Sequence, residues 1–134
     1  MAEPRTLVAG EATGPALVLE EPLSFWGGID PASGRIVDVH HPQHGASVTG
    51  TVLVLPAGRG SSSSSSVLAE AIRVGTAPSA IVLRGADPIV ALGAIVAREL
   101  YGVTVPVVIC SAPPEAAVLV VDASVDQATV RPSG

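Results

Sequence analysis

Short apolar runs separated by turn-forming residues dominate the first part of the chain. Two such runs occupy residues 6–9 and 16–19. Residues 35–40 alternate roughly between apolar and polar positions, as a half-buried strand does. Residues 51–55 are rich in apolar and β-branched side chains and end at Pro56, which is typical of a buried central strand. The pattern therefore predicts a β-rich N-terminal half.

Further along the chain, the spacing of apolar residues takes a helical period in two places. One helix is predicted from Val67 to Gly75, where the glycine is a natural stop. A second helix is predicted over residues 88–101, because Asp87 is placed to cap its start and Gly102 follows its end.

Apolar strands alternate with these helices, at residues 51–55, 80–83 and 105–110. The order β–α–β–α–β implies a parallel layer with right-handed crossovers. Two short strands, at residues 116–121 and 127–130, are expected to close the fold. The sequence thus predicts an α/β protein whose β-rich N-terminal half packs on a βαβαβ half. A length of 134 residues fits a single domain over residues 1–134.

Composition excludes disorder and narrows the range of partners. Hydrophobic residues make up 48% of the chain and charged residues 14%, so there is enough apolar surface for a core. The net charge is −5, and all seven basic residues are arginines scattered along the chain. Binding to nucleic acid without sequence preference needs clustered Lys and Arg. Nucleic acid is therefore not an expected partner.

Nothing in the sequence indicates a membrane or an export route. No apolar stretch reaches the ~20 residues of a membrane span, and the N-terminus lacks the apolar segment of a signal peptide. The expected location is the cytoplasm. Because Cys110 is the single cysteine, we expect no internal disulfide and no metal or iron–sulfur site on this chain alone.

The turn Gly58-Arg59-Gly60-Ser61 is the candidate site. It opens a run of six serines between a predicted strand and a predicted helix. The first N–H groups of a helix have no intrahelical partner and carry a partial positive charge. Glycines let the backbone approach a ligand, and Arg59 adds a fixed cation. These features together favour binding of a carboxylate or a phosphate.

Known phosphate-binding motifs do not fit this turn. A P-loop needs a lysine, and the chain has none. The dinucleotide fingerprint needs a third glycine where Ser63 stands. The serines could instead form a plain helix cap or a flexible linker. A serine here could also act as a base, since helix amides and Arg59 favour its alkoxide, but another polypeptide would then have to complete the chemistry.

Two further segments allow more than one interpretation. Phe25 and Trp26 are the only Phe and Trp, and they form either a local core plug or a contact surface for a partner. All three histidines, His40, His41 and His44, lie close together in sequence. They could bind a metal with a nearby carboxylate, or they could belong to a polar turn, for instance at an interface.

Four segments together resemble the small subunit of the aconitase X family. They are residues 23–34, 41–50, 58–65 and 87–97, and the resemblance extends over almost the whole chain. It implies a swivelling β/β/α domain in a heteromeric enzyme whose large subunit carries an iron–sulfur cluster through its own cysteines. Bacterial members with this pattern look like cis-3-hydroxy-L-proline dehydratase, which removes water to give Δ1-pyrroline-2-carboxylate.

The resemblance also implies roles for residues of the serine turn. In the wider aconitase superfamily a Gly-x-Gly-Ser-Ser turn carries the serine base, and Ser61 matches it. Ser61 would remove the proton beside the substrate carboxylate, while the cluster, as Lewis acid, helps the hydroxyl leave. The superfamily has an arginine where this chain has Ser63. Arg59, Gly60 and Ser62 are therefore the candidates for binding the small hydroxy-acid substrate.

Two alternatives stay open. Archaeal relatives are phosphomevalonate dehydratases whose loop reads Gly-Lys-Gly-Ser-Thr, whereas Arg59 and the serine run favour the hydroxyproline substrate. The second alternative is a non-catalytic anion-binding or carrier module, since the swivelling fold also serves phosphohistidine carriers. A carrier needs a histidine at the turn before the helix, and this chain has serines there.

Overall fold

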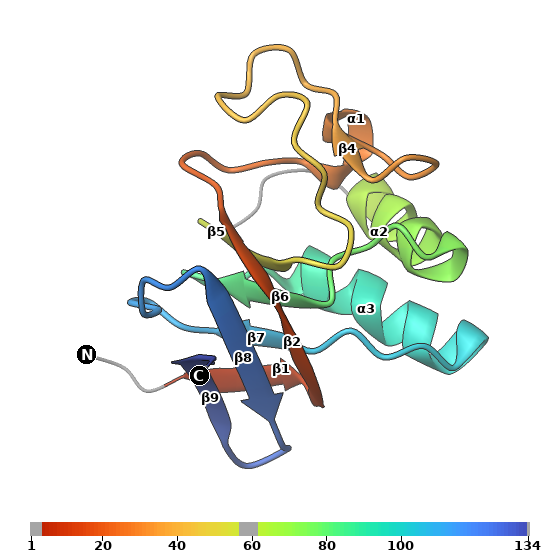
Figure 1. Ribbon diagram of the computed structural model, residues 1–134. Coiled ribbons are helices and arrows are strands. Elements are labelled where there is room, and N and C mark those ends of the chain that lie inside the picture. Colours follow the sequence, from red (N-terminus) through yellow and green to blue (C-terminus); the bar gives the residue numbers. More distant parts are fainter. Residues whose placement is uncertain (1–3, 57–61, 134) are drawn as a thin grey trace.

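The computed structural model describes residues 4–56 and 62–133 (Figure 1). The helices of the described residues are α1 (Phe25–Gly28), α2 (Ser62–Val74) and α3 (Pro88–Tyr101). The strands are β1 (Arg5–Val8), β2 (Gly10–Val18), β3 (Ile29–Asp30), β4 (Arg35–Ile36), β5 (Val52–Leu55), β6 (Ala80–Leu83), β7 (Val107–Ile109), β8 (Val118–Ala123) and β9 (Ala128–Pro132). No helix of the described residues is long and apolar enough to cross a membrane.

The main sheet has seven strands in the order β1-β7-β6-β5-β2-β8-β9. Strands β5, β6 and β7 are parallel, and β2 runs parallel to β5. The pairs β1–β7, β2–β8 and β8–β9 are antiparallel. The predicted parallel layer and the two closing strands are therefore confirmed, with strand ends shifted by a few residues.

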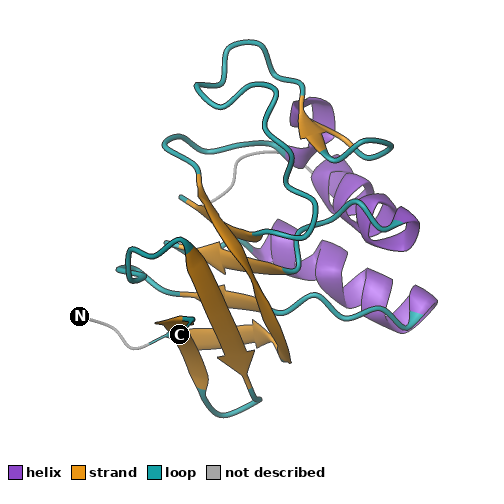
Figure 2. Ribbon diagram, viewed as in Figure 1, coloured by secondary structure: helices purple, strands orange, loops and turns teal. Residues whose placement is uncertain are grey.

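The parallel strands are covered on both faces. Along β5, Leu53 and Leu55 pack in one core with α2 and α3, while Val52 and Val54 pack in a second core with β8 and β9. Strand β6 divides in the same way, with Ile81 in the first core. Figure 2 shows the helices gathered on one side of the sheet. This arrangement of two β layers and one α layer confirms the predicted α/β class and the β/β/α layering.

The N-terminal strands belong to the same sheet as the βαβαβ unit. Strand β2 pairs through residues 16–18 with β5 and through residues 10–15 with β8. Strand β1 pairs with β7 at the other side of the parallel layer. The β-rich first part of the chain thus packs on the βαβαβ part by extending its sheet.

The strand predicted over residues 35–40 is wrong beyond Ile36. Only Arg35 and Ile36 form a strand, which pairs with β3. The chain turns after Val37, because the Asp38 carboxylate accepts a hydrogen bond from the His40 N–H at 2.9 Å. An Asx turn of this kind competes with strand pairing, and alternation of apolar and polar residues alone does not reveal it.

Both long helices end where the sequence predicts, but α2 begins earlier. Helix α3 covers Pro88–Tyr101, and Gly102 ends it with φ +68°. Helix α2 begins at Ser62 rather than near Val67, so serines form its first turns. Serine has a modest intrinsic preference for helices, and packing of the first turns against neighbouring elements outweighs it.

Helices α2 and α3 touch closely at Gly93. A Cβ atom at this position would lie 2.8 Å from the Ser65 carbonyl oxygen and 3.1 Å from the Leu68 Cβ. The absence of a side chain therefore sets the distance between α3 and the first turns of α2.

We expect Gly93→Ala to destabilise the fold. The gain of about 1 kcal/mol in helix propensity is smaller than the about 1–3 kcal/mol that overpacking typically costs. Urea unfolding measures the difference. Leu92→Ala, at the neighbouring exposed position, is the control and should change stability by about 0.5 kcal/mol or less. A Gly93→Ala protein as stable as the wild type would contradict the close contact.

The buried Asp87 caps α3. Its Oδ1 accepts hydrogen bonds from the Ile89 N–H at 3.0 Å and the Val90 N–H at 3.3 Å. We expect Asp87→Ala to lower the free energy of unfolding by about 1 kcal/mol, while Asp87→Asn, which can cap equally well, retains most of it. Thermal unfolding of the two variants tests this. Equal losses in both would show that the cap hydrogen bonds contribute little.

Candidate active site

The starts of α2 and α3 lie at one edge of the sheet. Strands β5 and β6 are parallel neighbours, and each leads into a helix from its carboxyl end. In open α/β sheets this edge is where ligands bind, because helix N-termini and loops meet there. Of the residues predicted for the site, Arg59, Gly60 and Ser61 lie outside the described residues. Ser62 is the first residue of α2.

The charge pattern of α2 suits an anion at its start. The first turn holds no acidic residue, and Arg73 lies in the last turn. Arg73 pairs with Glu70 at 2.6 Å, and its guanidinium lowers the pKa of that carboxyl. A cation near the C-terminus complements the helix macrodipole, while the positive N-terminal end has no acidic side chain of the first turn beside it. The geometry agrees with the predicted preference for a carboxylate or a phosphate.

A short segment, α1, is fastened to the first turns of α2. Ser64 is buried, and its Oγ lies 3.1 Å from the Ser24 Oγ. The backbone N–H of Trp26 donates to the same Ser64 oxygen at 3.3 Å. The serine run thus contributes at least one side chain that joins two elements, which rules out a flexible linker for this part of the run.

The two neighbouring aromatic residues have different environments. Phe25 is 1% exposed and belongs to the core between sheet and helices, whereas Trp26 is 61% exposed. The two interpretations of this pair, core plug and contact surface, therefore apply to one residue each. Sequence could not divide them, because α1 is interrupted at Trp26 and at Gly27, whose φ is +76°.

His41 organises a loop. Its ring is buried; Nδ1 accepts from the Gln43 N–H at 3.0 Å, so Nε2 carries the proton and donates to the Glu21 carbonyl at 3.1 Å. The Gln43 side chain bonds the backbone of Val18 and Glu20. Within the described residues there is no group of three His, Cys, Asp or Glu side chains that could hold a metal ion. These contacts favour the polar turn over the metal site.

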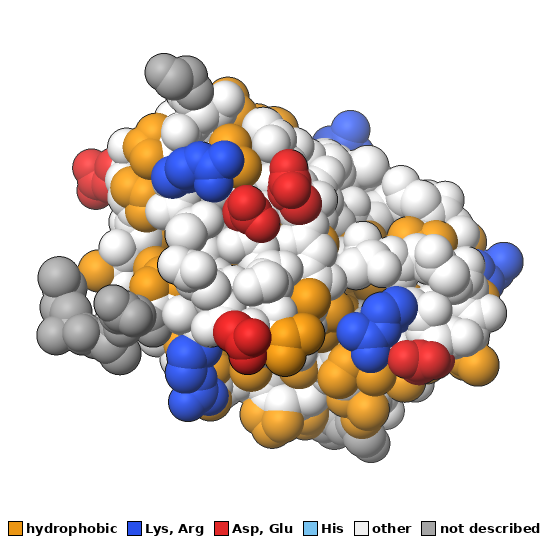
Figure 3. All heavy atoms as spheres, turned by 90° about the horizontal axis from the view of Figure 1, so that it is seen from below, with side chains coloured by type: hydrophobic (Ala, Val, Ile, Leu, Met, Phe, Trp, Pro, Cys, Tyr) orange, Lys and Arg blue, Asp and Glu red, His pale blue; other side chains and the backbone are white. Residues whose placement is uncertain are grey.

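Charges on the surface are dispersed. On the face seen in Figure 3, arginine side chains lie apart from one another, and acidic side chains lie between them. Cys110 is buried in the core between the two β layers, packed with residues of β5, β6 and β8. Its burial there leaves its sulfur without access to a ligand from solvent.

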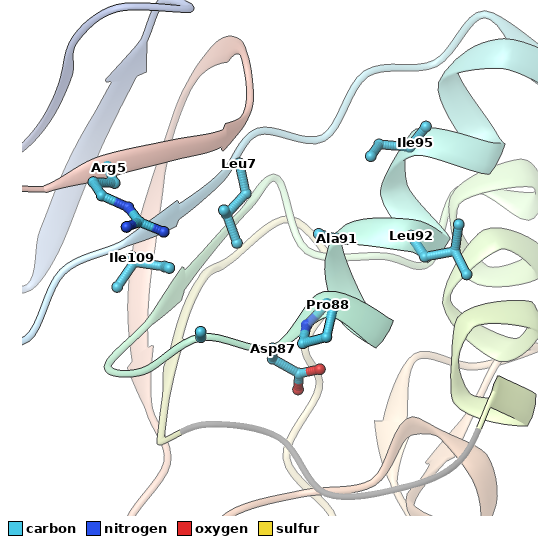
Figure 4. Close-up of a pocket in the computed structure, with 9 residues that line it drawn as sticks. Arg5, Leu7, Asp87, Pro88, Ala91, Leu92, Ile95 and Ile109 are labelled. Atoms are coloured by element: carbon cyan, nitrogen blue, oxygen red, sulfur yellow. The ribbon is translucent and has the colours of Figure 1, made fainter.

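A groove of about 520 Å³ borders the start of α3, and sequence reasoning missed it. Figure 4 shows Arg5 and Leu7 of β1 on one side and Leu92 and Ile95 of α3 on the other. The lining is mostly apolar, so this groove differs in chemistry from the serine-rich start of α2. It forms through tertiary contacts between β1 and α3, which no local pattern reveals.

Comparison with known proteins gives consistent results. The family model described as Aconitase X swivel domain matches residues 1–129. The chain is 55% identical over 104 residues to cis-3-hydroxy-L-proline dehydratase of Pseudomonas aeruginosa, which covers 78% of this chain and 18% of that protein. It is 48% identical over 93 residues to the phosphomevalonate dehydratase small subunit of Methanothermobacter thermautotrophicus, which covers 69% and 71%. The chain therefore spans less than a fifth of the first relative and most of the second.

Solved structures agree on the fold. The crystal structure of Thermococcus kodakaraensis aconitase X in its holo-form matches with a TM-score of 0.81 and 32% identity, covering 96% of both chains. A UPF0107 protein solved by NMR in solution matches with a TM-score of 0.80. Because the family model covers nearly the whole chain and the known fold superposes over almost its full length, this chain belongs to the aconitase X swivel domain family.

Proposed function

We propose that this chain is the small subunit of a cytoplasmic hydro-lyase that converts cis-3-hydroxy-L-proline to Δ1-pyrroline-2-carboxylate. The observation that carries the proposal is the 55% identity to a hydroxyproline dehydratase, together with relatives named dehydratase small subunits that this chain matches over most of their length. Arg59 and the serine run add support from the sequence. A small subunit needs a large partner, and the chain alone should be inactive.

The start of α2 supplies the chemistry of this chain. Ser61 is the proposed base, one residue before the first helical residue. It takes the proton from the carbon between the ring nitrogen and C3, beside the carboxylate. The C3 hydroxyl leaves as water, and the resulting enamine tautomerises to the cyclic imine. Arg59, Gly60, Ser62 and the helix N–H groups hold the substrate carboxylate, because the helix end attracts anions.

An iron–sulfur cluster does not fit the described residues of this chain. They include no cluster of metal-ligating side chains, and Cys110 is buried in the β/β core. We therefore assign the expected iron–sulfur cluster and its cysteine ligands to the large subunit. What this chain contributes is the base and the anion-binding helix end.

A second candidate substrate is supported by the relatives. The 48% identity to an archaeal phosphomevalonate dehydratase small subunit extends over 71% of that protein. Both substrates carry an anionic group and a hydroxyl, so the start of α2 suits either. Residues of the large subunit would decide between them. The carrier alternative has less support, since the best-fixed histidine, His41, serves a loop rather than a helix start.

The assay that tests the function uses both subunits. The small chain is co-expressed with its large subunit, purified without oxygen, and supplied with cis-3-hydroxy-L-proline. We expect the cyclic imine to form only when both chains are present. A stable complex that is inactive on hydroxyproline but dehydrates phosphomevalonate would replace the substrate. No complex at all would overturn the small-subunit assignment.

In the active complex, Ser61→Ala should lower kcat by about 10²–10⁴-fold, the usual contribution of a general base. Ser66→Ala is the matched control, because Ser66 is exposed on the same helix, and it should keep kcat within about two-fold. Steady-state kinetics on complexes of verified composition give both values. If Ser61→Ala retains nearly full activity, the base is another residue.

A further inference from the structure

The exposure of Trp26 is unusual for this chain. It is the only tryptophan among few aromatic residues, and 61% of its surface is exposed. Large aromatic side chains that remain exposed are enriched where proteins bind partners, and tryptophan leads among the residues that dominate binding energy. Trp26 is therefore the first residue to consider as a contact of a partner.

The backbone of α1 holds this side chain in a fixed place. Phe25 before it is buried in the core, and the Trp26 N–H donates to the Ser64 Oγ at 3.3 Å. Gly28 behind it is buried, and its carbonyl accepts from the Val37 N–H at 2.8 Å. A side chain on a pre-ordered backbone loses less entropy when it is buried by a partner. The segment thus presents the indole rather than merely exposing it.

The position of Trp26 connects it to the candidate active site. Its hydrogen-bond partner Ser64 is the third residue of α2, so α1 lies against the helix start that carries the proposed base and anion site. Two more exposed apolar residues, Val37 at 44% and Val39 at 70%, follow β4 in the same lobe, seen above α2 in Figure 1. A protein that completes the site must therefore come close to these three side chains.

We propose that Trp26, flanked by Val37 and Val39, is the anchor through which this chain docks on its large subunit. The inference rests on the proposed function, which requires a partner at the start of α2. The large subunit would offer an apolar pocket to the indole beside its own part of the active site. Through the Ser64 hydrogen bond, the docked indole would also hold the first turns of α2 in place for catalysis.

The affinity of the two purified subunits tests the anchor. We expect Trp26→Ala to weaken the complex by about 30-fold or more, as expected of a residue that dominates binding energy. Leu100→Ala is the matched control, because Leu100 is 68% exposed at the far end of α3. It should change the affinity by about two-fold or less. Unfolding curves of the isolated variants confirm that both remain folded.

Activity separates docking from catalysis. With Trp26→Ala, turnover should fall at limiting large subunit and return to near the wild-type value when the large subunit is in excess. Turnover that stays low in a fully formed complex would overturn the docking role and make Trp26 a contact of the substrate. Equal losses of affinity for Trp26→Ala and Leu100→Ala would overturn the specificity of the anchor.

A spectroscopic measurement reports on Trp26 directly. Because the chain has one tryptophan, 5-fluorotryptophan labelling gives a single ¹⁹F resonance. Unlabelled large subunit should shift this resonance and remove its sensitivity to exchange of H2O for D2O. An unchanged resonance in a formed and active complex would overturn the anchor alone. A shift that depends on the concentration of the isolated chain would overturn it in favour of self-association. If the wild-type subunits do not bind, the proposed function fails instead.

Discussion

The whole fold depends on burying β5 and β6 on both faces. Every residue of these strands is buried, and alternate side chains enter different cores. Such strands cannot face water on either side, so the chain must supply two covers. Helices α2 and α3 form one cover, and strands β8 and β9 form the other. The shape of the domain and the position of the site follow from this requirement.

The same requirement places the site. When parallel strands are joined by helices on one face, the helix starts gather at the carboxyl edge of the sheet. Helix α3 closes its own start with Asp87, whose carboxylate accepts two backbone N–H groups. Helix α2 instead begins in serines, with no acidic residue in its first turn. Two helices with equivalent positions thus differ in chemistry, and only α2 is suited to hold an anion.

Local signals in the sequence predict the parts of this fold that are decided locally. The cap at Asp87, the stop at Gly102 and the unbroken apolar runs of β5 and β6 are of this kind. The early start of α2 depends on tertiary contacts such as the one between Ser64 and α1. The division between buried Phe25 and exposed Trp26 also depends on packing, as does the groove between β1 and α3. The serine turn was found through its composition and its likeness to a family, and periodicity contributes nothing to it.

The pairing of β2 with β8 has a consequence for synthesis of the chain on the ribosome. Residues 10–15 wait for residues 118–123, which are made more than a hundred residues later. Until then the parallel layer has its helices but lacks its second cover, and the apolar row that includes Val52, Val54 and Val82 has no strand to meet. Contacts so distant in sequence form late and slowly. The nascent domain therefore passes through a sticky half-covered stage, during which chaperones or an early partner have something to protect.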